Sequence, residues 1–294
     1  MSYVTRFAPS PTGPLHLGHA YSAILAHDRA LENGGRFLLR IEDIDRDRSK
    51  PEWEQQIYDD LAWLGLSWDT PVMRQSDRLL TYRNALKSLW ERDLLYPCSC
   101  TRRDIIDAAS APQEGVQYGP DGIVYPGTCR TKPRLPGFMT ELPENVALRL
   151  NMTMAAELTG TPRVGMGRVL SFTETGDGET GLIEKTTDQI ASEVGDIVLS
   201  RKDFLGSYHL SVVLDDAAQG VTHVVRGLDL FEATHIHVVL QHLLGLPTPR
   251  YHHHRLIRDE AGKRLAKRDD ARAIAKYRAD GATPTDIRRL VGLS

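Results

Sequence analysis

The hydrophobic positions of the first 41 residues predict a strand, a helix and a second strand. An apolar stretch at 3–8 leads into a loop rich in proline and glycine at 9–15. Apolar residues then recur at helical spacing until an Asn-Gly-Gly turn at 33–35, namely Leu17, Ala20, Ile24, Leu25 and Leu31. The stretch 36–41 is again typical of a strand. Such a β-α-β unit predicts a parallel sheet with ligand-binding residues at the carboxyl ends of its strands.

Two more amphipathic helices and a second set of regular elements follow. One helix ends at Gly65, and its apolar face consists of Trp53, Ile57, Leu61 and Leu64. The next could be capped by Ser76, and its apolar face consists of Leu79, Leu86, Leu89 and Trp90. Further along, the pattern predicts regular structure at 195–199 and 208–214, a strand at 223–226 and a helix over 232–244.

The segment 96–188 differs from the regions on either side of it. Prolines and glycines are frequent there, helical periodicity is weak, and all three cysteines of the chain lie within it. We interpret it as an α+β subdomain inserted into an α/β domain of Rossmann type with a parallel sheet. The expected division is 1–95 and 189–262 for the two halves of the sheet domain, 96–188 for the insertion, and 263–294 for a basic loop with a short helical C-terminus.

Composition and charge exclude several classes of protein. The chain has 294 residues, 26% of them charged, which is ordinary for a globular protein with a large core. A formal net charge of −3 gives no overall attraction to nucleic acid, so an RNA-binding surface would have to be a local patch. No apolar run reaches the roughly 18 residues of a membrane helix. The absence of a signal peptide and an odd number of cysteines indicate a cytoplasmic protein in a reducing compartment.

The strongest local signal is the run Pro9-Ser10-Pro11-Thr12-Gly13-Pro14-Leu15-His16-Leu17-Gly18-His19, between the first strand and the first helix. The start of a helix favours anions, because backbone N–H groups are available there and the helix dipole is positive. His16 and His19 lie on one face and can donate hydrogen bonds to phosphate oxygens. Gly18 would let a nucleotide approach the backbone closely. H-x-G-H alone is weak evidence, but in this context it indicates a nucleotide site.

Five segments together resemble the glutamyl-tRNA synthetases, a family of class I aminoacyl-tRNA synthetases. They occur in the family's order, at 6–19, 41–43, 208–216, 222–227 and 264–268, so the likeness covers most of residues 1–270. The first and last of them contain the counterparts of the HIGH and KMSKS motifs. Only 26 residues follow Arg268, where the full-length family has a helical anticodon-binding part. The resemblance therefore implies a truncated subgroup without that domain, the glutamyl-queuosine tRNA(Asp) synthetases.

In that family the two motifs hold ATP, with Mg²⁺, while glutamate attacks the α-phosphate to form glutamyl-adenylate. The resemblance implies an ATP site made of His16, Gly18, His19, Arg264, Leu265, Ala266, Lys267 and Arg268. It gives catalytic roles to His16, His19 and Lys267, and the charge of Lys267 would stabilise the phosphates in the transition state. Arg264 replaces the family's first lysine and Ala266 its serine, which predicts a working but slower loop. A basic surface loop is the alternative interpretation.

The resemblance also implies a site for glutamate. Its residues are Arg6, Phe7, Ala8, Pro9, Ser10, Glu42, Tyr208 and Arg226. The two arginines suit carboxylates, the glutamate side chain suits the α-amino group, and the tyrosine adds a hydroxyl and a wall. Each of these residues ends or follows a predicted strand. Taken singly they would be ordinary salt bridges. Val212 stands where the full-length family has an asparagine, which predicts a looser site.

Cys98-Ser99-Cys100 and Cys129 form a candidate zinc site, because structural zinc takes four ligands in a tetrahedron. No histidine lies between Cys98 and Cys129, so the fourth ligand would be an oxygen donor or water. The resemblance implies Tyr125 and one structural Zn²⁺, whereas composition alone favours Tyr125 no more than Tyr118 or an aspartate. Three reduced structural cysteines are the alternative.

The sequence thus favours an enzyme that activates L-glutamate with ATP and transfers it to RNA. The resemblance and the short C-terminal segment imply the queuosine base in the anticodon of tRNA(Asp) as the acceptor. Two alternatives stay open: a minimal glutamyl-tRNA synthetase that charges a tRNA 3′ end, and an inactive paralogue that binds RNA. The inactive paralogue would need a broken site, but His16, His19, Glu42, Arg226 and Lys267 are all present. We expect a monomer without membrane association.

Overall fold

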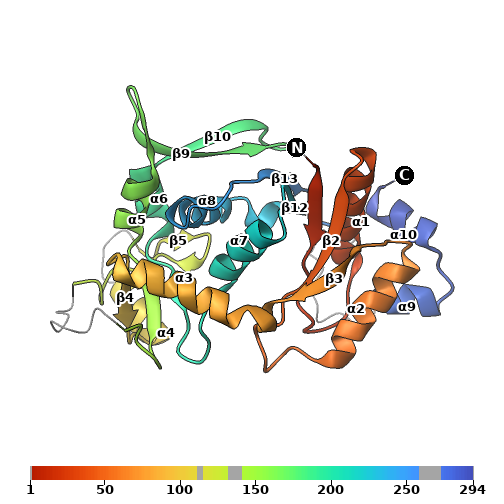
Figure 1. The fold of residues 1–294 in the computed structure, drawn as a ribbon, viewed down its shortest axis with the longest axis horizontal. Coiled ribbons are helices and arrows are strands. Elements are labelled where there is room, and N and C mark those ends of the chain that lie inside the picture. The colour runs from red at the N-terminus through yellow and green to blue at the C-terminus, as the bar shows by residue number, and fades with distance from the viewer. Residues whose placement is uncertain (1, 111–114, 132–140, 258–272, 294) are drawn as a thin grey trace.

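The computed structural model describes residues 2–110, 115–131, 141–257 and 273–293. Figure 1 shows parallel strands and their helices at one end of the molecule, a long hairpin across the top, and a smaller sheet with short helices at the other end. The loop at 263–268, on which the ATP prediction partly depends, lies outside the described residues.

The N-terminal unit has the predicted β-α-β order. Its strands pair in parallel and in sequence order: β1 (Val4–Phe7), β2 (Arg36–Ile41) and β3 (Asp69–Arg74). Two helices join them, α1 (Leu17–Glu32) and α2 (Pro51–Trp63). Asn33 caps the end of α1, and Gly34 follows with a φ of 60°, a conformation that costs glycine little. These elements confirm the predictions from hydrophobic spacing.

The predicted cap at Ser76 is wrong. A short 3₁₀ helix, η1 (Gln75–Arg78), leads directly into α3 (Leu79–Glu91), and Ser76 lies inside it. The N-cap position of α3 is Arg78, which makes no side-chain capping bond. The backbone N–H of Ser76 instead donates to Asp43 Oδ1 at 2.8 Å. Because the 3₁₀ turn precedes α3, Ser76 lies inside that turn and not at the N-cap position of α3.

A second sheet is built from strands of the C-terminal half of the chain. The strands β12 (His223–Gly227) and β13 (Arg250–His254) are parallel, and η2 (Leu228–Leu230) and α8 (Thr234–Leu243) connect them. The same sheet contains β8 (Thr161–Arg163), β9 (Gly167–Glu174) and β10 (Gly181–Thr186). Residues 162–188, which belong to the expected insertion, thus form strands that share a sheet with strands of 189–262. The expected four-part division stays a prediction.

The remaining strands form an antiparallel sheet in the order β11 (Val198–Ser200), β7 (Ala147–Leu150) and β4 (Leu95–Cys98). Around it lie α4 (Arg102–Ala109), α5 (Met152–Thr159), α6 (Thr187–Val194) and the hairpin of β5 (Tyr118–Gly119) and β6 (Gly122–Ile123). Asp196 ties this region together. Its buried carboxylate accepts hydrogen bonds from Tyr96, from Arg130 Nε at 2.7 Å and from the backbone of Met152 at 2.8 Å.

Tyr208 is the first residue of a helix, α7 (Tyr208–Ala218). The sequence pattern instead predicts a position at the end of a strand or directly after one. Ser207 caps this helix, because its hydroxyl accepts the Leu210 N–H at 3.4 Å. The mainly apolar segment 208–214 suits either a buried strand or a buried helix, and the cap was the missed signal. Near the end of α7, the buried Asp215 accepts hydrogen bonds from Gln75, Arg78 and Tyr82, at 3.0, 2.6 and 2.8 Å.

The C-terminal helices pack against the N-terminal unit. They are α9 (Ile274–Ala279) and α10 (Pro284–Val291). Arg288 pairs with Asp28 of α1 through two hydrogen bonds of 2.6 and 3.0 Å. Ile274, Ile287 and Val291 are buried in the same hydrophobic cluster as the helix α1. The predicted short helical C-terminus is thus part of the core around α1.

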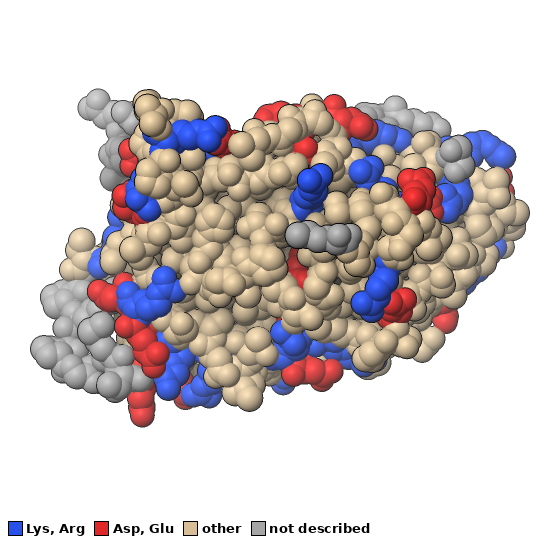
Figure 2. Space-filling view, turned by 45° about the horizontal axis from the view of Figure 1, so that its top comes forward, with Lys and Arg blue, Asp and Glu red and all other residues tan. Residues whose placement is uncertain are grey.

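The surface carries charges of both signs without large patches in the view of Figure 2. Lys and Arg lie singly or beside Asp and Glu, and much of the face is uncharged. No dense basic cluster stands out among the described residues drawn there. Among the helices that the structure describes, none is long and apolar enough to cross a membrane.

Replacing Asp215 tests the junction of η1, α3 and α7. The substitution Asp215→Ala leaves the partly buried Arg78 and the buried Tyr82 without their acceptor, so we expect the free energy of unfolding to fall by about 3 kcal/mol. Chemical denaturation measures it. The control Asp203→Ala removes an exposed ion pair with Arg201 and should change stability by less than about 0.5 kcal/mol. Equal effects of the two substitutions would contradict the role of Asp215.

Candidate active site

One cavity of about 680 Å³ opens where the carboxyl ends of β1, β2 and β12 meet the start of α1. Its lining includes every residue predicted for the glutamate site and the three predicted ATP ligands that the structure describes. The lining residues are Arg6, Phe7, Ala8, Pro9, Ser10, His16, Gly18, His19, Ser22, Glu42, Tyr208, Val225, Arg226, Gly227, Asp229, Leu230, His254, Leu256 and Ile257. The residues predicted for glutamate thus share one cavity with the H-x-G-H segment at the start of α1.

Two histidine side chains cap the start of α1. His16 Nδ1 accepts the backbone N–H of Gly18 at 3.1 Å, and His19 Nδ1 accepts the backbone N–H of His16 at 3.2 Å. The two rings stack with their centroids 3.8 Å apart. Because each Nδ1 accepts, each neutral ring carries its proton on Nε2. A Cβ at Gly18 would lie 3.0 Å from the His16 ring, so glycine leaves the space that this ring occupies.

Four buried charges alternate in sign beneath the cavity. Asp216 on α7 accepts Arg6 Nε at 2.9 Å and Arg40 NH1 at 2.6 Å, and Arg40 NH2 donates to Glu42 at 3.1 Å. Burial alone would raise the pKa of Asp216, but the two arginines together hold it below its usual range. Burial also raises the pKa of Glu42, against the attraction of Arg40. The sequence-predicted pair Arg6 and Glu42 is therefore already charge-balanced by two residues that were not predicted.

Arg226 is held from several sides by neutral acceptors. Its Nε donates to His253 Nε2 at 3.0 Å and its NH1 to His237 Nδ1 at 2.9 Å. Its NH2 donates to Thr234 Oγ1 at 2.7 Å and to the Leu230 carbonyl at 3.1 Å. Since none of these acceptors is charged, the positive charge of Arg226 is not neutralised by them. The side chain is thus fixed in direction while its charge stays available to an anion.

Glu174 of β9 fixes one of those acceptors. Its carboxylate accepts His253 Nδ1 at 2.5 Å and the backbone N–H groups of His253 and Gly176 at 2.9 and 2.6 Å. Burial opposes ionisation, but these hydrogen bonds outweigh it and lower the pKa of Glu174 to about 2. A carboxylate that accepts His253 Nδ1–H leaves Nε2 as an acceptor for Arg226. The hairpin at 167–186 therefore contributes to the alignment of Arg226.

Ser22 and His254 form a further polar pair in the cavity wall. They are joined at 2.7 Å between Ser22 Oγ and His254 Nε2. His254 Nδ1 lies 2.8 Å from the carbonyl of Arg255, to which it donates, so Nε2 accepts the Ser22 hydroxyl proton. Burial lowers the pKa of His254, which favours this neutral form.

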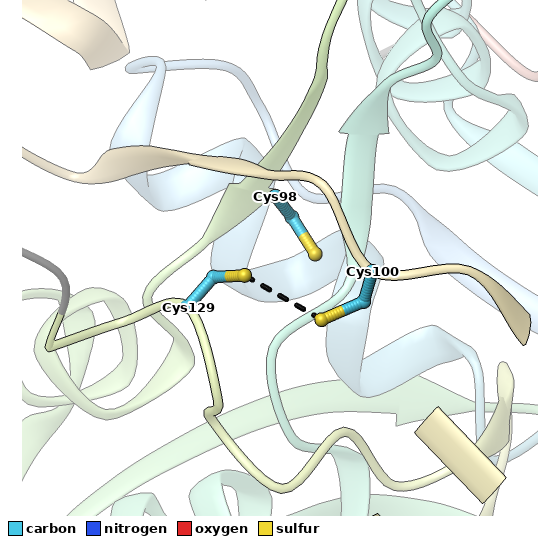
Figure 3. Close-up of side chains that lie close together, drawn as sticks. All are labelled: Cys98, Cys100 and Cys129. Carbon is cyan, nitrogen blue, oxygen red and sulfur yellow. Dashed lines mark hydrogen bonds between the residues drawn. The ribbon is translucent and has the colours of Figure 1, made fainter. Parts of the chain in front are cut away.

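The three cysteines come together as predicted from the sequence. Cys98 and Cys100 project from one stretch of chain and Cys129 from another, with their sulfur atoms turned toward one another (Figure 3). The three Sγ atoms lie within 4.8 Å of one another. The Tyr125 hydroxyl lies 3.5 Å from Cys98 Sγ and 3.3 Å from Cys100 Sγ. Tetrahedral zinc with Zn–S bonds of about 2.3 Å separates its sulfurs by about 3.8 Å, so these four side chains fit that ion.

Several residues of the site were not found from the sequence. They are Arg40, Glu174, Asp216, His237 and His253. A signal existed for Arg40, which lies two residues before Glu42 along a strand and so faces the same side. Asp216 lies eight residues after Tyr208, about two turns along one helix face, but only if 208–216 is taken as a helix. The remaining three, Glu174, His237 and His253, are brought close to Arg226 only by tertiary structure.

A model of the family "tRNA synthetases class I (E and Q), catalytic domain" matches residues 2–119 and 170–294. The chain therefore belongs to this family, whose members are ligases that use an amino acid, ATP and a tRNA. The expected class I catalytic fold, a parallel sheet with helices, is confirmed. Residues 120–169 lie outside the match and contain Tyr125 and Cys129.

Individual relatives narrow this likeness. The chain is 66% identical over 291 residues to a glutamyl-Q tRNA(Asp) synthetase of Rhodobacter capsulatus, covering 99% of this chain and all of that protein. A protein of the same name from Nocardia farcinica is 41% identical, covering 97% of this chain and 82% of that protein. The glutamate-tRNA synthetase structure from Elizabethkingia anophelis aligns with a TM-score of 0.74 and 26% identity, over 99% of this chain. The chain spans 61% of that structure. The sequence resemblance is thereby confirmed.

The pKa of Glu174 predicts how stability depends on pH. A carboxylate whose pKa falls from 4.5 to about 2 on folding stabilises the folded state above pH 4.5, and this contribution is lost as the pH falls toward 2. Glu174→Gln should therefore lower the free energy of unfolding by about 3 kcal/mol at neutral pH and by much less near pH 2. Denaturation at a series of pH values measures this. The exposed substitution Glu179→Gln serves as control, and a pH-independent difference for Glu174→Gln contradicts the assignment.

Proposed function

We propose that the protein activates L-glutamate with ATP to glutamyl-adenylate and transfers the glutamate to the queuosine base in the anticodon of tRNA(Asp). The observation that carries the proposal is the single cavity, in which the glutamate-type residues meet the H-x-G-H turn of α1. The names of the relatives with 66% and 41% identity support the choice of acceptor.

The charge of the pocket suits glutamate. Charges of both signs line the cavity or lie directly beneath it: Arg6, Arg40, Arg226, Glu42, Asp216 and Asp229. L-Glutamate carries two carboxylates and one ammonium group, so it needs partners of both signs in one pocket. Arg226 would bind a carboxylate, and Glu42 the α-ammonium group, which would also favour the ionised form of Glu42.

The nucleotide would lie toward the start of α1. His16 and His19 carry their protons on Nε2, the form that donates to phosphate oxygens. A carboxylate oxygen of glutamate would attack the α-phosphorus of ATP, and pyrophosphate would leave. Mg²⁺ and the positive charge of Lys267 would stabilise the negative charge on the phosphates. The apolar side chains of Leu256 and Ile257 would provide a wall for the base.

Two contacts support the participation of the loop 263–268, which lies outside the described residues. Ile257, the last described residue before it, lines the cavity. After it, Ala273 pairs with His16, and the Ile274 N–H donates to the Leu15 carbonyl at 2.8 Å. The described chain thus stops at the cavity and resumes beside the start of α1, which supports the proposal that Arg264 to Arg268 would contact the nucleotide.

We further propose that Cys98, Cys100, Tyr125 and Cys129 hold one structural Zn²⁺. The converging sulfur atoms and the tyrosine hydroxyl support this ligand set. Such a site would stiffen the insertion, which would meet the RNA. We also expect the protein to act as a monomer in the cytoplasm, where its proposed substrates occur.

Transfer of labelled glutamate to defined tRNAs tests the function. We expect ATP-dependent labelling of tRNA(Asp) that contains queuosine, and none of tRNA(Asp) without queuosine or of tRNA(Glu). Label on tRNA(Glu) would instead favour a minimal charging enzyme. The similarity to a glutamate-tRNA synthetase structure supports this second candidate. No label in any sample would leave an RNA-binding paralogue.

The adenylate step is tested separately, by glutamate-dependent pyrophosphate exchange with a variant of Lys267. Lys267→Ala should slow glutamate-dependent pyrophosphate exchange by about a hundredfold or more, because one transition-state cation is lost. Its melting temperature should match that of the wild-type protein. Unchanged exchange would remove Lys267 from the mechanism.

The zinc proposal predicts about one zinc per chain by elemental analysis. Cys98→Ser should lower both the zinc content and the thermal stability, because structural zinc contributes directly to folding free energy. The exposed neighbour provides a matched control, Ser99→Ala, which should keep both. Full stability of Cys98→Ser and of chelator-treated protein, with no zinc found, would mean three reduced structural cysteines.

A further inference from the structure

A line of hydrogen bonds leads from Arg226 out of the cavity to the insertion. Arg226 NH1 donates to His237 Nδ1 at 2.9 Å. His237 Nε2 lies 3.1 Å from His209 Nδ1, and His209 Nε2 lies 3.1 Å from Asp121 Oδ1. The four residues come from β12, α8, α7 and the turn between β5 and β6. The predicted mechanism uses only the first of them.

The direction of every bond in this line is determined by its two ends. Arg226 can only donate, so His237 Nδ1 accepts and the proton of a neutral His237 is on Nε2. That proton is donated to His209 Nδ1, which places the proton of His209 on Nε2. Asp121 can accept it, because an ionised carboxylate is only an acceptor. Both residues are buried, with 1% of His237 and 6% of His209 exposed. Burial and the nearby Arg226 lower the pKa of His237 well below its usual value, which favours the neutral ring.

We propose that Asp121, His209 and His237 are positioning residues for glutamate binding, which hold the Arg226 guanidinium in the direction that the substrate carboxylate requires. This inference rests on the proposed function. The acceptor at Asp121 determines which nitrogen of each ring carries the proton. In both rings Nε2, on the side of Asp121, is the donor, and Nδ1, on the side of Arg226, is the acceptor. The reverse arrangement of protons would turn the His237 Nδ1–H against the N–H of Arg226.

The direction of Arg226 matters because few of its donors remain for a ligand. The bonds to His253, His237, Thr234 and Leu230 use four of the five guanidinium N–H groups. A carboxylate in the cavity would therefore be bound by the fifth N–H, on NH1, and by the charge. NH1 is the atom whose other hydrogen goes to His237. Loss of that partner would free the one atom that must be aligned.

Asp121, the acceptor at the end of the line, lies in a different part of the chain from the other three residues. Asp121 lies in the segment 120–169, outside the match to the family model, whereas His209, His237 and Arg226 lie inside it. Its side chain is 43% exposed, against 8% for His209. It also lies four residues before Tyr125 in the proposed zinc site. The insertion would thereby influence the amino-acid site without entering the cavity.

Steady-state pyrophosphate exchange on the full chain tests the proposal through two variants of His209. His209→Phe keeps the ring volume but removes both bonds, so we expect the KM for glutamate to rise about tenfold. His209→Gln offers an acceptor to His237 and a donor to Asp121, so it should restore most of the loss. For both, the KM for ATP should stay within about twofold of the wild-type value. A structural role alone would lower stability or move both KM values together.

Asp121 provides the test that does not disturb the core. Asp121→Ala should raise the KM for glutamate about threefold, because water can partly replace the acceptor, and Asp121→Asn should stay close to wild type. The matched control is Asp107→Ala, an exposed carboxylate of the insertion paired only with Arg103 in the described residues. An unchanged glutamate KM in both His209→Phe and Asp121→Ala, with normal wild-type exchange, would overturn the proposal.

A spectroscopic measurement separates this inference from the proposed function. In ¹⁵N-histidine-labelled protein, His209 and His237 should both be neutral with the proton on Nε2, and His209→Phe should change the signal of His237. A proton on Nδ1 of either ring would overturn the line of hydrogen bonds. A wild-type protein that shows these signals but no glutamate-dependent exchange would contradict the proposed function and leave the geometry standing.

Discussion

Asp216 is the residue on which the arrangement of the site depends. Its carboxylate receives Arg6 from β1 and Arg40 from β2 while it is itself carried by α7. Two arginines on neighbouring parallel strands would repel each other in a buried space, and burial of either charge alone is costly. The shared carboxylate makes their proximity possible. It thereby fixes the distance between the N-terminal unit and the helix that begins with Tyr208.

The hydrogen-bond acceptors of Arg226 differ in charge from those of Arg6 and Arg40. Arg6 and Arg40 contact carboxylates, whereas the described acceptors of Arg226 are two histidines, a hydroxyl and a carbonyl. His253 contacts the carboxylate of Glu174 directly, whereas His237 is linked to the carboxylate of Asp121 through the ring of His209. The negative charges are thus one ring and two rings away from the guanidinium. The result is a rigid cation whose electrostatic attraction is reserved for a ligand.

Local patterns in the sequence predicted what local interactions determine. The helix α1, the strand β2 and the position of Glu42 follow from spacing and from turn residues, and the converging cysteines follow from their chemistry. The helical start at Tyr208 was missed because a short apolar run does not distinguish a strand from a helix. Asp216, Glu174 and His237 could not be predicted, because their partners lie far along the chain and are met only through tertiary packing.

The wide separation of these partners has a consequence for the order of events during synthesis. Arg6 meets Asp216 across 210 residues, and Ser22 meets His254 across 232. The N-terminal β-α-β unit can become compact early, since its contacts are local. Arg6 and Arg40 can therefore gain their shared acceptor only after Asp216 has been synthesised. The wall that contains Ser22 and His254 is complete only after most of the chain has been made.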